Sequence, residues 1–306
     1  MTHSIAAAEL HATLGPDLSA LVSDRPAPLE CAAEVSTLRQ LGRARCAILL
    51  EFADGTRLKG RRFDSVSKAR RAAELLDAIG AGYPRIVARR GDALLLEWIE
   101  GSTLSSLTAL PPATMKRCGA MLGRLHTLDV SNLADGPPPA HEDPEAALGR
   151  TIDELGRAGV LDADRARRAL DFAAAHRPSA PSIGIVHQDF CAENLVQDAS
   201  GAVVCIDNAT LDHGPHDFDL ARTWYRWPMN ALEGASFADG YSEHRDLDGF
   251  RRHFGFWATV VVVVAAARRH RMGVTGVNEA LGRLDHVLSS EHGSLDKGWP
   301  PAGPHG

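Results

Sequence analysis

The sequence of 306 residues lacks the marks of several protein classes. Its five cysteines show no C-x-x-C spacing, and an odd number without a disulfide framework favours reduced thiols in a cytoplasm. The net charge of −6 gives no overall basic excess for binding nucleic acid. The amino-terminal segment has no basic stretch followed by a continuous apolar run, so we expect no signal peptide. No internal repeat and no glycine-rich phosphate loop is visible.

The most apolar run, from Phe254 to Ala267, has 14 residues. It is shorter than the roughly 20 residues that a helix needs to span a bilayer. Its β-branched residues favour a strand, whereas its length and the basic residues that follow are typical of a helix and its carboxyl end. We therefore predict a buried helix and no membrane span.

The first third of the sequence alternates between strand and helix patterns. Residues 43–63 predict two strands around the turn sequence ADGT, and residues 85–101 predict a second hairpin around the sequence RGD. Between the hairpins, residues 65–82 predict a helix that Ser65 or Ser67 caps. The order strand, strand, helix, strand, strand indicates a small α+β unit.

Helical patterns dominate after Gly101. We predict helices from near Pro112 and over residues 144–158 and 162–176, and an isolated hairpin at 194–206. The expected organisation is a small sheet-rich lobe at 1–101, a larger helical lobe at 102–290 and a flexible tail at 291–306.

The two lobes differ in charge. Residues 1–102 contain 14 Lys and Arg and 13 Asp and Glu, and the remainder contains 19 and 26. An acidic excess is typical of a solvated surface, but a pocket for a cationic substrate needs the same excess. The acidic residues that favour such a pocket are Glu142, Asp143, Glu145, Asp153 and Glu154.

Several polar residues interrupt the β-rich stretch from Gly184 to Thr223. Phosphoryl transfer from ATP needs a carboxylate that accepts the proton of the attacking hydroxyl, and oxygen ligands for Mg²⁺. In the pattern H-x-D-x-x-x-x-N, Asp189 matches the first requirement, while Asn194 and Asp207, at the two ends of the predicted hairpin, match the second. The pattern is common by chance when it stands alone.

The segments VHQDFCAENLV, VVCIDN and DFDLA together resemble the catalytic segment of aminoglycoside phosphotransferases and choline kinase-like enzymes. The segment LGRLHTLD at 122–129 is similar to the helix before the catalytic loop in that family, and LLLEWIEG at 94–101 is similar to its hinge. The resemblance covers roughly residues 31–290. It implies a bilobal protein-kinase-like fold with a catalytic hairpin in the larger lobe, and a hinge at 97–101.

The resemblance also implies roles for the matching residues. Asp189 would be the catalytic base, and Asn194 and Asp207 would bind Mg²⁺. His187 and Asp219 would support the catalytic loop through hydrogen bonds.

On the nucleotide side, the resemblance implies that the carbonyl of Glu97 and the N–H of Ile99 meet adenine. Lys59 would contact the α- and β-phosphates, and Glu74 would hold Lys59. Other arginines compete with Lys59 on its strand, so Lys59 is also interpretable as a solvated lysine, and Glu74 as a surface charge on an amphipathic helix. The competing arginines are Arg57, Arg61 and Arg62.

The chain departs from the family pattern beside the proposed chemistry. Gln188 stands where the family usually has glycine, the sequence Cys191-Ala192-Glu193 replaces His-Pro-Gly, and Asn208 replaces an aromatic residue. Cys191 lies in the catalytic loop, but no activating histidine is apparent, so we interpret it as a small apolar residue.

The expected activity is transfer of phosphate from ATP or GTP, with Mg²⁺, to a hydroxyl of a small molecule, such as a cationic antibiotic or an amino alcohol. The alternatives are a kinase of sugars, nucleosides or envelope saccharides, a nucleotide-binding pseudokinase, and an enzyme that transfers AMP. We expect a cytoplasmic protein.

Overall fold

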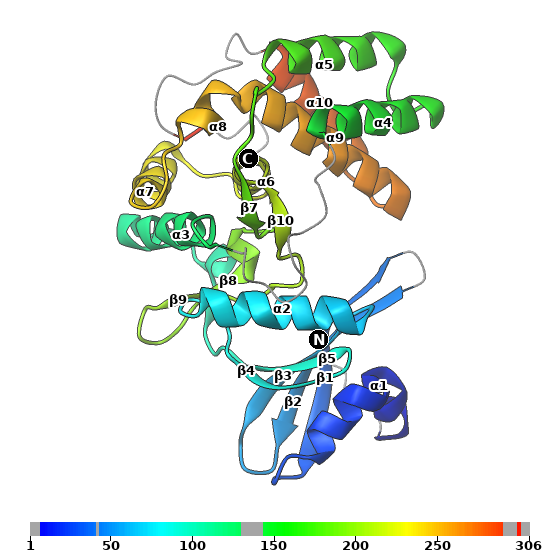
Figure 1. The fold of residues 1–306 in the computed structure, drawn as a ribbon, viewed down its shortest axis with the longest axis vertical. Coiled ribbons are helices and arrows are strands. Elements are labelled where there is room, and N and C mark those ends of the chain that lie inside the picture. Colours follow the sequence, from blue (N-terminus) through cyan, green and yellow to red (C-terminus); the bar gives the residue numbers. More distant parts are fainter. Residues whose placement is uncertain (1–6, 41–42, 130–142, 290–298, 301–306) are drawn as a thin grey trace. The chain divides into compact units, whose positions relative to one another are not determined.

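The computed structural model describes residues 7–40, 43–129, 143–289 and 299–300, and for residues 7–13, 34–40 and 43–46 it describes the backbone alone. Contacts between Cα atoms divide the chain into two compact units. Unit 1 contains the chain up to Ser102 together with Val196–Ala209, and unit 2 contains most of the remainder. Figure 1 shows the elements of both units.

Unit 1 is built on a five-stranded antiparallel sheet in the order β1-β2-β3-β5-β4. The strands are β1 (Leu29–Gln40), β2 (Arg43–Phe52), β3 (Arg57–Arg62), β4 (Ile86–Arg90) and β5 (Ala93–Glu97). Both predicted hairpins are confirmed, with β2 joined to β3 and β4 joined to β5 by short turns.

Two helices accompany this sheet. Helix α1 (Ala7–Ser23) contacts β3, β4 and β5, and Leu18 from α1 lies under Gly60 of β3. Side chains alternate along a strand, so Lys59 and Arg61 project from the opposite face of β3. Helix α2 (Val66–Ile79) begins at Ser65, whose side chain accepts from the N–H of Lys68, as predicted.

The segment Val196–Ala209 belongs with unit 1, although continuous boundaries at 101 and 290 would place it in the larger lobe. Its hairpin is formed by β8 (Leu195–Gln197) and β9 (Val203–Cys205), next to the short strand β6 (Ser102–Thr103). The second half of this segment is hydrogen-bonded to unit 1, because the N–H of Cys205 donates to the carbonyl of Gly82 at 2.9 Å.

Unit 2 is largely helical. Its helices are α3 (Pro112–Leu125), α4 (Pro144–Arg157), α5 (Ala163–Ala175), α6 (His216–Arg226), α7 (Ala231–Ser242), α8 (Asp248–Arg252), α9 (Phe254–Met272) and α10 (Val277–Ser289). Two short 3-10 turns lie at Leu104–Ser106 and Ala192–Asn194. Strand β7 (Ile183–Val186) pairs antiparallel with β10 (Asp212–Pro215).

Helix α9 forms the centre of unit 2 and confirms the buried helix predicted from Phe254 onward. Its residues from Phe254 to Val263 are all buried, and it packs against α4, α5, α6 and α10. Burial on all sides explains why its sequence shows no amphipathic pattern. Among the helices that the structure describes, none is long and apolar enough to cross a membrane.

Helices α3 and α7 approach each other closely because glycines line their contact. A Cβ on Gly119 would lie 1.9 Å from the carbonyl oxygen of Phe237, and a Cβ on Gly240 would lie 1.8 Å from that of Lys116. No side chain fits at either position, so this helix pair depends on both glycines.

The sequence patterns did not predict α1, β1 or β10. Helix α1 contains Gly15 and Pro16, which usually interrupt helices, and its backbone is non-helical at Gly15. Asp212–Pro215 forms β10, and the next residue, His216, is buried with its ring stacked on that of His126. The predicted tail at 291–306 lies outside the described residues except at 299–300.

Candidate active site

The predicted site residues lie in both units. His187, Asp189, Asn194 and Asp219 belong to unit 2, and Lys59, Glu74, Glu97, Ile99 and Asp207 belong to unit 1.

The loop after β7 is held by a buried carboxylate from α6. Asp219 Oδ2 accepts from the N–H of His187 at 2.6 Å, and Asp219 Oδ1 accepts from the N–H of Gln188 at 2.7 Å. Gln188 has φ = 62°, and no other non-glycine residue in the described ranges has positive φ. This backbone conformation suits glycine best, and the hydrogen bonds to Asp219 hold Gln188 in it.

Two histidines complete the support of the loop. His126 lies 3.1 Å from Asp219 Oδ2 through Nε2 and 2.8 Å from the hydroxyl of Tyr241 through Nδ1. Burial lowers the pKa of His126, against the opposing effects of the hydrogen bond and the charge of Asp219. His187 is fully buried, its Nδ1 accepts from the N–H of Asp189 at 3.3 Å, and its carbonyl accepts from the hydroxyl of Thr210 at 2.7 Å.

Asp189 presents a partly exposed carboxylate at the end of this loop, with 23% of its side chain accessible. The amide of Asn194 donates to its carbonyl at 2.8 Å and to its Oδ2 at 3.2 Å. On the other side, Arg222 Nη2 lies 3.2 Å from its Oδ1, and Arg226 Nε lies 3.7 Å from the same atom. An oriented, accessible carboxylate of this kind can accept a proton from a hydroxyl.

Lys59 and Arg61 of β3 meet the segment that carries Asp207. Lys59 Nζ donates to the carbonyl of Ile206 at 2.8 Å, and Arg61 Nη1 lies 3.0 Å from Asp207 Oδ1. Burial lowers the pKa of Lys59 to about 8, against the opposing effect of the Asp207 charge. Unit 1 therefore brings two cations, not one, to the neighbourhood of Asp207.

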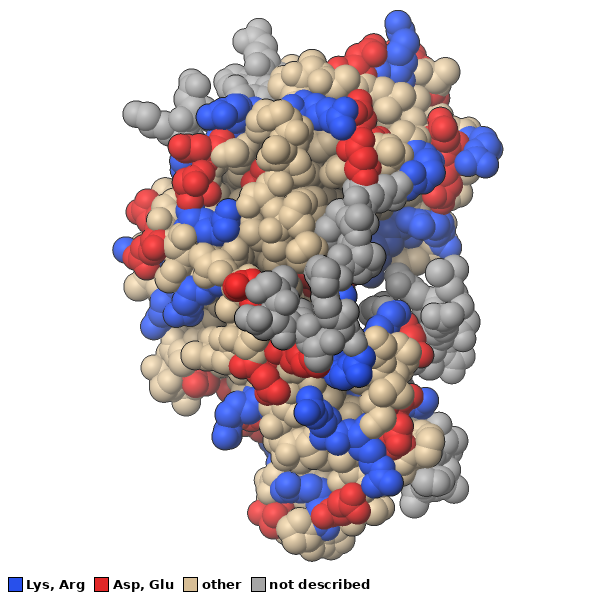
Figure 2. All heavy atoms as spheres, viewed as in Figure 1, with Lys and Arg blue, Asp and Glu red and all other residues tan. Residues whose placement is uncertain are grey.

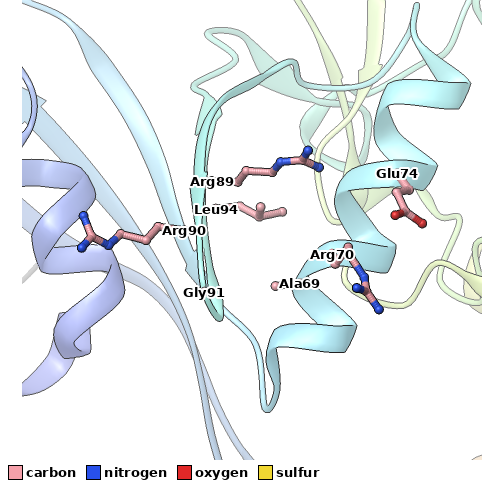
Figure 3. A pocket seen from close by; sticks show the side chains of 7 residues that line it. All are labelled: Ala69, Arg70, Glu74, Arg89, Arg90, Gly91 and Leu94. Carbon is pink, nitrogen blue, oxygen red and sulfur yellow. The ribbon is translucent and has the colours of Figure 1, made fainter. Parts of the chain in front are cut away.

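In the described part of the chain, no ion pair or hydrogen bond joins Glu74 to Lys59, so the expected pairing is not found. Glu74 instead lines a cavity of about 310 Å³ between α2 and the β4–β5 hairpin, shown in Figure 3. Its Oε2 is buried without a hydrogen-bond partner. The other lining residues are Ala69, Arg70, Arg89, Arg90, Gly91 and Leu94.

Glu97 and Ile99 border a larger cavity of about 500 Å³ in unit 1. Its remaining walls come from residues 98, 100 and 101, from Tyr83 and from the β8–β9 hairpin. Among the described residues, the N–H of Ile99 donates to no other residue, so it is available to a ligand. A Cβ on Gly101 would lie 2.2 Å from the carbonyl oxygen of Gln197, so glycine lets the chain pass this hairpin.

The two predicted metal ligands have suitable chemistry for Mg²⁺. The amide nitrogen of Asn194 is used by Asp189, and within the described chain its Oδ1 accepts no hydrogen bond. Asp207 offers a carboxylate with 37% of its side chain accessible. Carboxylate and amide oxygens are the protein ligands that Mg²⁺ accepts, with phosphate oxygens completing its shell.

The remaining departures from the family pattern have structural explanations. Asn208 is buried, and its amide donates to the carbonyl of Cys205 at 3.0 Å, which closes the turn after β9. Cys191 is buried, and burial raises the pKa of its thiol, which makes it a poor nucleophile. Glu193 lies 2.6 Å from Arg226 Nη2.

The sequence reasoning missed Arg222 and Arg226 as residues of the site. Both belong to the segment DFDLARTWYR, and their spacing of four residues places them on one face of α6 with Asp219. This periodicity was the available signal. Arg61 was recognised only as a competitor of Lys59.

Comparisons with known proteins identify the family and the fold. The model of the phosphotransferase enzyme family matches residues 56–254. No curated protein matches the chain in sequence. Among solved structures, it is similar to a type I macrolide 2′-phosphotransferase, with a TM-score of 0.64 and 17% identity over 94% of this chain and 99% of that one.

Two further structures extend the likeness. The macrolide 2′-phosphotransferase MphH of Brachybacterium faecium has a TM-score of 0.59 and 16% identity over 92% of this chain and 98% of that one. An ethanolamine kinase of Plasmodium vivax has a TM-score of 0.60 and 13% identity over 85% and 82%. The sheet-rich and helical units confirm the predicted α+β fold of the protein-kinase-like type. The family model covers more than half of the chain, so the chain belongs to the phosphotransferase enzyme family.

Proposed function

We propose that the protein transfers the γ-phosphoryl group of ATP to a hydroxyl of a small molecule, with Mg²⁺ as cofactor. The observation that carries the proposal is Asp189, an accessible carboxylate whose backbone and side chain are both anchored. Asp189 accepts the proton of the acceptor hydroxyl as the oxygen bonds to the γ-phosphorus. The bond to the β,γ-bridging oxygen breaks, and ADP leaves.

The residues of unit 1 bind the nucleotide in this proposal. The cavity beside Glu97 and Ile99 takes the adenine, and Lys59 contacts the phosphates. Asn194 and Asp207 would hold Mg²⁺, which would supply positive charge to offset that of the phosphates. GTP is the alternative donor, because a purine of either kind suits a cavity of about 500 Å³.

Surface charge does not favour a cationic acceptor. The acidic residues on and before α4 pair locally, with Asp143 3.0 Å from Arg177 Nη2 and Glu154 3.5 Å from Arg271 Nε. Glu145 also pairs with Arg177, whereas Glu142 lies outside the described residues. On the face that Figure 2 shows, acidic and basic side chains are interspersed in both units. The local pairing of Asp143, Glu145 and Glu154 favours a solvated surface over an acceptor pocket at these residues.

The test is an Asp189→Asn variant in an assay of phosphate transfer, with products identified by mass spectrometry. We expect kcat to fall about 10²- to 10⁴-fold while binding of Mg·ATP is retained, because only the proton acceptor is removed. Asp171→Asn, at an exposed position of α5, is the matched control. Transfer at the wild-type rate by Asp189→Asn contradicts the proposal, and a nucleotidyl group on the product identifies AMP transfer instead.

A further inference from the structure

Two arginines from one face of α6 reach the proposed base. Arg222 and Arg226 stand one helical turn apart, and both approach Asp189 Oδ1, at 3.2 and 3.7 Å. Two guanidinium groups therefore lie beside the proposed base.

Arg222 is committed to the loop itself. Its Nε donates to the carbonyl of Gln188 at 2.9 Å and its Nη2 to Asp189, and only 7% of the residue is accessible. Both bonds hold the protein's own groups, so Arg222 positions the base and has little left to offer a ligand.

Arg226 is held by a partner that a ligand can replace. Its Nη2 lies 2.6 Å from Glu193 Oε2, but the side chain of Glu193 is 66% accessible and that of Arg226 is 35% accessible. An exposed ion pair of this kind contributes roughly 0–1 kcal/mol. An anionic ligand can therefore take the place of Glu193 at small cost.

Arg268 adds a third positive charge from α9, which packs against α6. Burial lowers the pKa of Arg222, and the charges of Arg268 and Arg226 lower it further. Arg268 is half-buried, and in the described residues it has no hydrogen bond or ion pair. The neighbouring Arg269, by contrast, donates to the hydroxyl of Tyr225. Arg222 and Arg226 thus face Asp189, Arg226 also pairs with Glu193, and the charge of Arg268 lies close enough to act on Arg222.

We propose that the acceptor carries an oxyanion, a carboxylate or a phosphate, close to the hydroxyl that Asp189 activates, and that Arg226 and Arg268 bind this group. The inference rests on the proposed function for the place of the hydroxyl. Guanidinium groups bind carboxylates and phosphates through paired hydrogen bonds, whereas they repel an ammonium group. The partial negative charge at the end of α9 is a competing reason for a basic residue at 268, and it predicts an effect on stability alone.

The test measures binding of inorganic phosphate and of acetate to the full-length protein by NMR, with the nucleotide site saturated by Mg²⁺ and a non-hydrolysable ATP analogue. We expect saturable binding to the wild type. Arg226→Gln and Arg268→Gln should each weaken it about tenfold or more, and Arg226→Lys should weaken it less. Glu193→Gln should strengthen it, because it removes the competing carboxylate. Arg271→Gln, an exposed position on the same helix, is the control.

Comparing the two anions separates a carboxylate site from a phosphate site. Absence of saturable binding, or equal binding by the wild type and both glutamine variants with retained circular dichroism, overturns the inference. An acceptor panel with a common three-carbon skeleton provides the second arm: glycerate, glycerol 3-phosphate, glycerol and 3-amino-1,2-propanediol. Preferential phosphorylation of the amine also overturns the inference. If the wild type does not bind Mg·ATP at all, the proposed function is contradicted instead.

Discussion

The substitution Asp219→Asn tests how the loop after β7 is held. The carboxylate is fully buried, with Oδ2 facing the N–H of His187 and Nε2 of His126, and Oδ1 facing the N–H of Gln188. An asparagine can place its carbonyl oxygen at only one of these two positions. Its amide nitrogen then faces a donor at the other position.

The expected cost follows from these contacts. Two hydrogen bonds change from charge-assisted to neutral and lose roughly 1 kcal/mol each, while the third is lost and leaves a buried donor unpaired at about 1–3 kcal/mol. We therefore expect the free energy of unfolding to fall by about 3–5 kcal/mol, a large part of the roughly 5–15 kcal/mol of a typical protein.

Urea unfolding at pH 7, where Asp219 is ionised, measures this loss directly. Burial raises the pKa of Asp219, but the hydrogen bond from His126 and the nearby histidines outweigh it, so the pKa is lowered overall. The stabilisation is therefore present at neutral pH and disappears as the pH falls through that lowered pKa. Asp239→Asn, exposed on α7, is the control and should change stability by less than about 0.5 kcal/mol. If Asp219→Asn lost as little stability as this control, the role of Asp219 would be refuted.

Three further predictions concern the backbone at Gln188, the contact of α3 with α7, and the carboxyl group of Asp217. In urea unfolding, Gln188→Gly should have a free energy of unfolding about 1 kcal/mol higher than Gln188→Ala, because the Cβ of alanine destabilises the left-handed backbone and glycine has none. Equal stabilities would contradict that conformation. Gly119→Ala should destabilise by about 1–3 kcal/mol, because its Cβ meets the Phe237 carbonyl, whereas Gly282→Ala, whose Cβ meets nothing within 4 Å, should not. Burial raises the pKa of Asp217 to about 6, so the folded state holds a proton that the unfolded state has lost, and stability falls as the pH rises from about 4 to 6. Asp217→Asn should remove this dependence in thermal melts at pH 4 and pH 7, and an unchanged slope would show that Asp217 is ionised in the folded state.

The parts of the fold that sequence patterns predicted are those with local causes. Helix α2 begins at Ser65, which bonds to the N–H three residues on, and the β2–β3 turn contains the favoured Asp54-Gly55 pair. Strand β1 has no comparable local pattern, because its hydrogen bonds come from β2. Helix α9 was predictable from its length and basic end in spite of its β-branched residues.

The contacts of the candidate site also divide into those with local causes and those that depend on residues far apart in the sequence. Asn194 bonds to Asp189 only five residues away, so a short motif carries that contact. Lys59, however, bonds to the carbonyl of Ile206, 147 residues away, and not to Glu74. Only the folded chain brings Lys59 and Ile206 together. The spacing in α6 places Arg222 on the face of Asp219, but its distance to Asp189 depends on how α6 packs against the loop after β7.

The glycine-lined contact of α3 with α7 has a consequence for how the protein is made. His126, just after α3, and its partner Tyr241 in α7 are separated by 115 residues. At roughly 5–20 residues per second, a ribosome needs on the order of ten seconds to add the second partner after the first. Throughout that interval the apolar face of α3 has no neighbour to cover it, and Gly119 leaves the helix intrinsically weak. Nascent chains that stop between residues 126 and 231 should therefore bind chaperones through α3, whereas chains that extend past residue 242 should not.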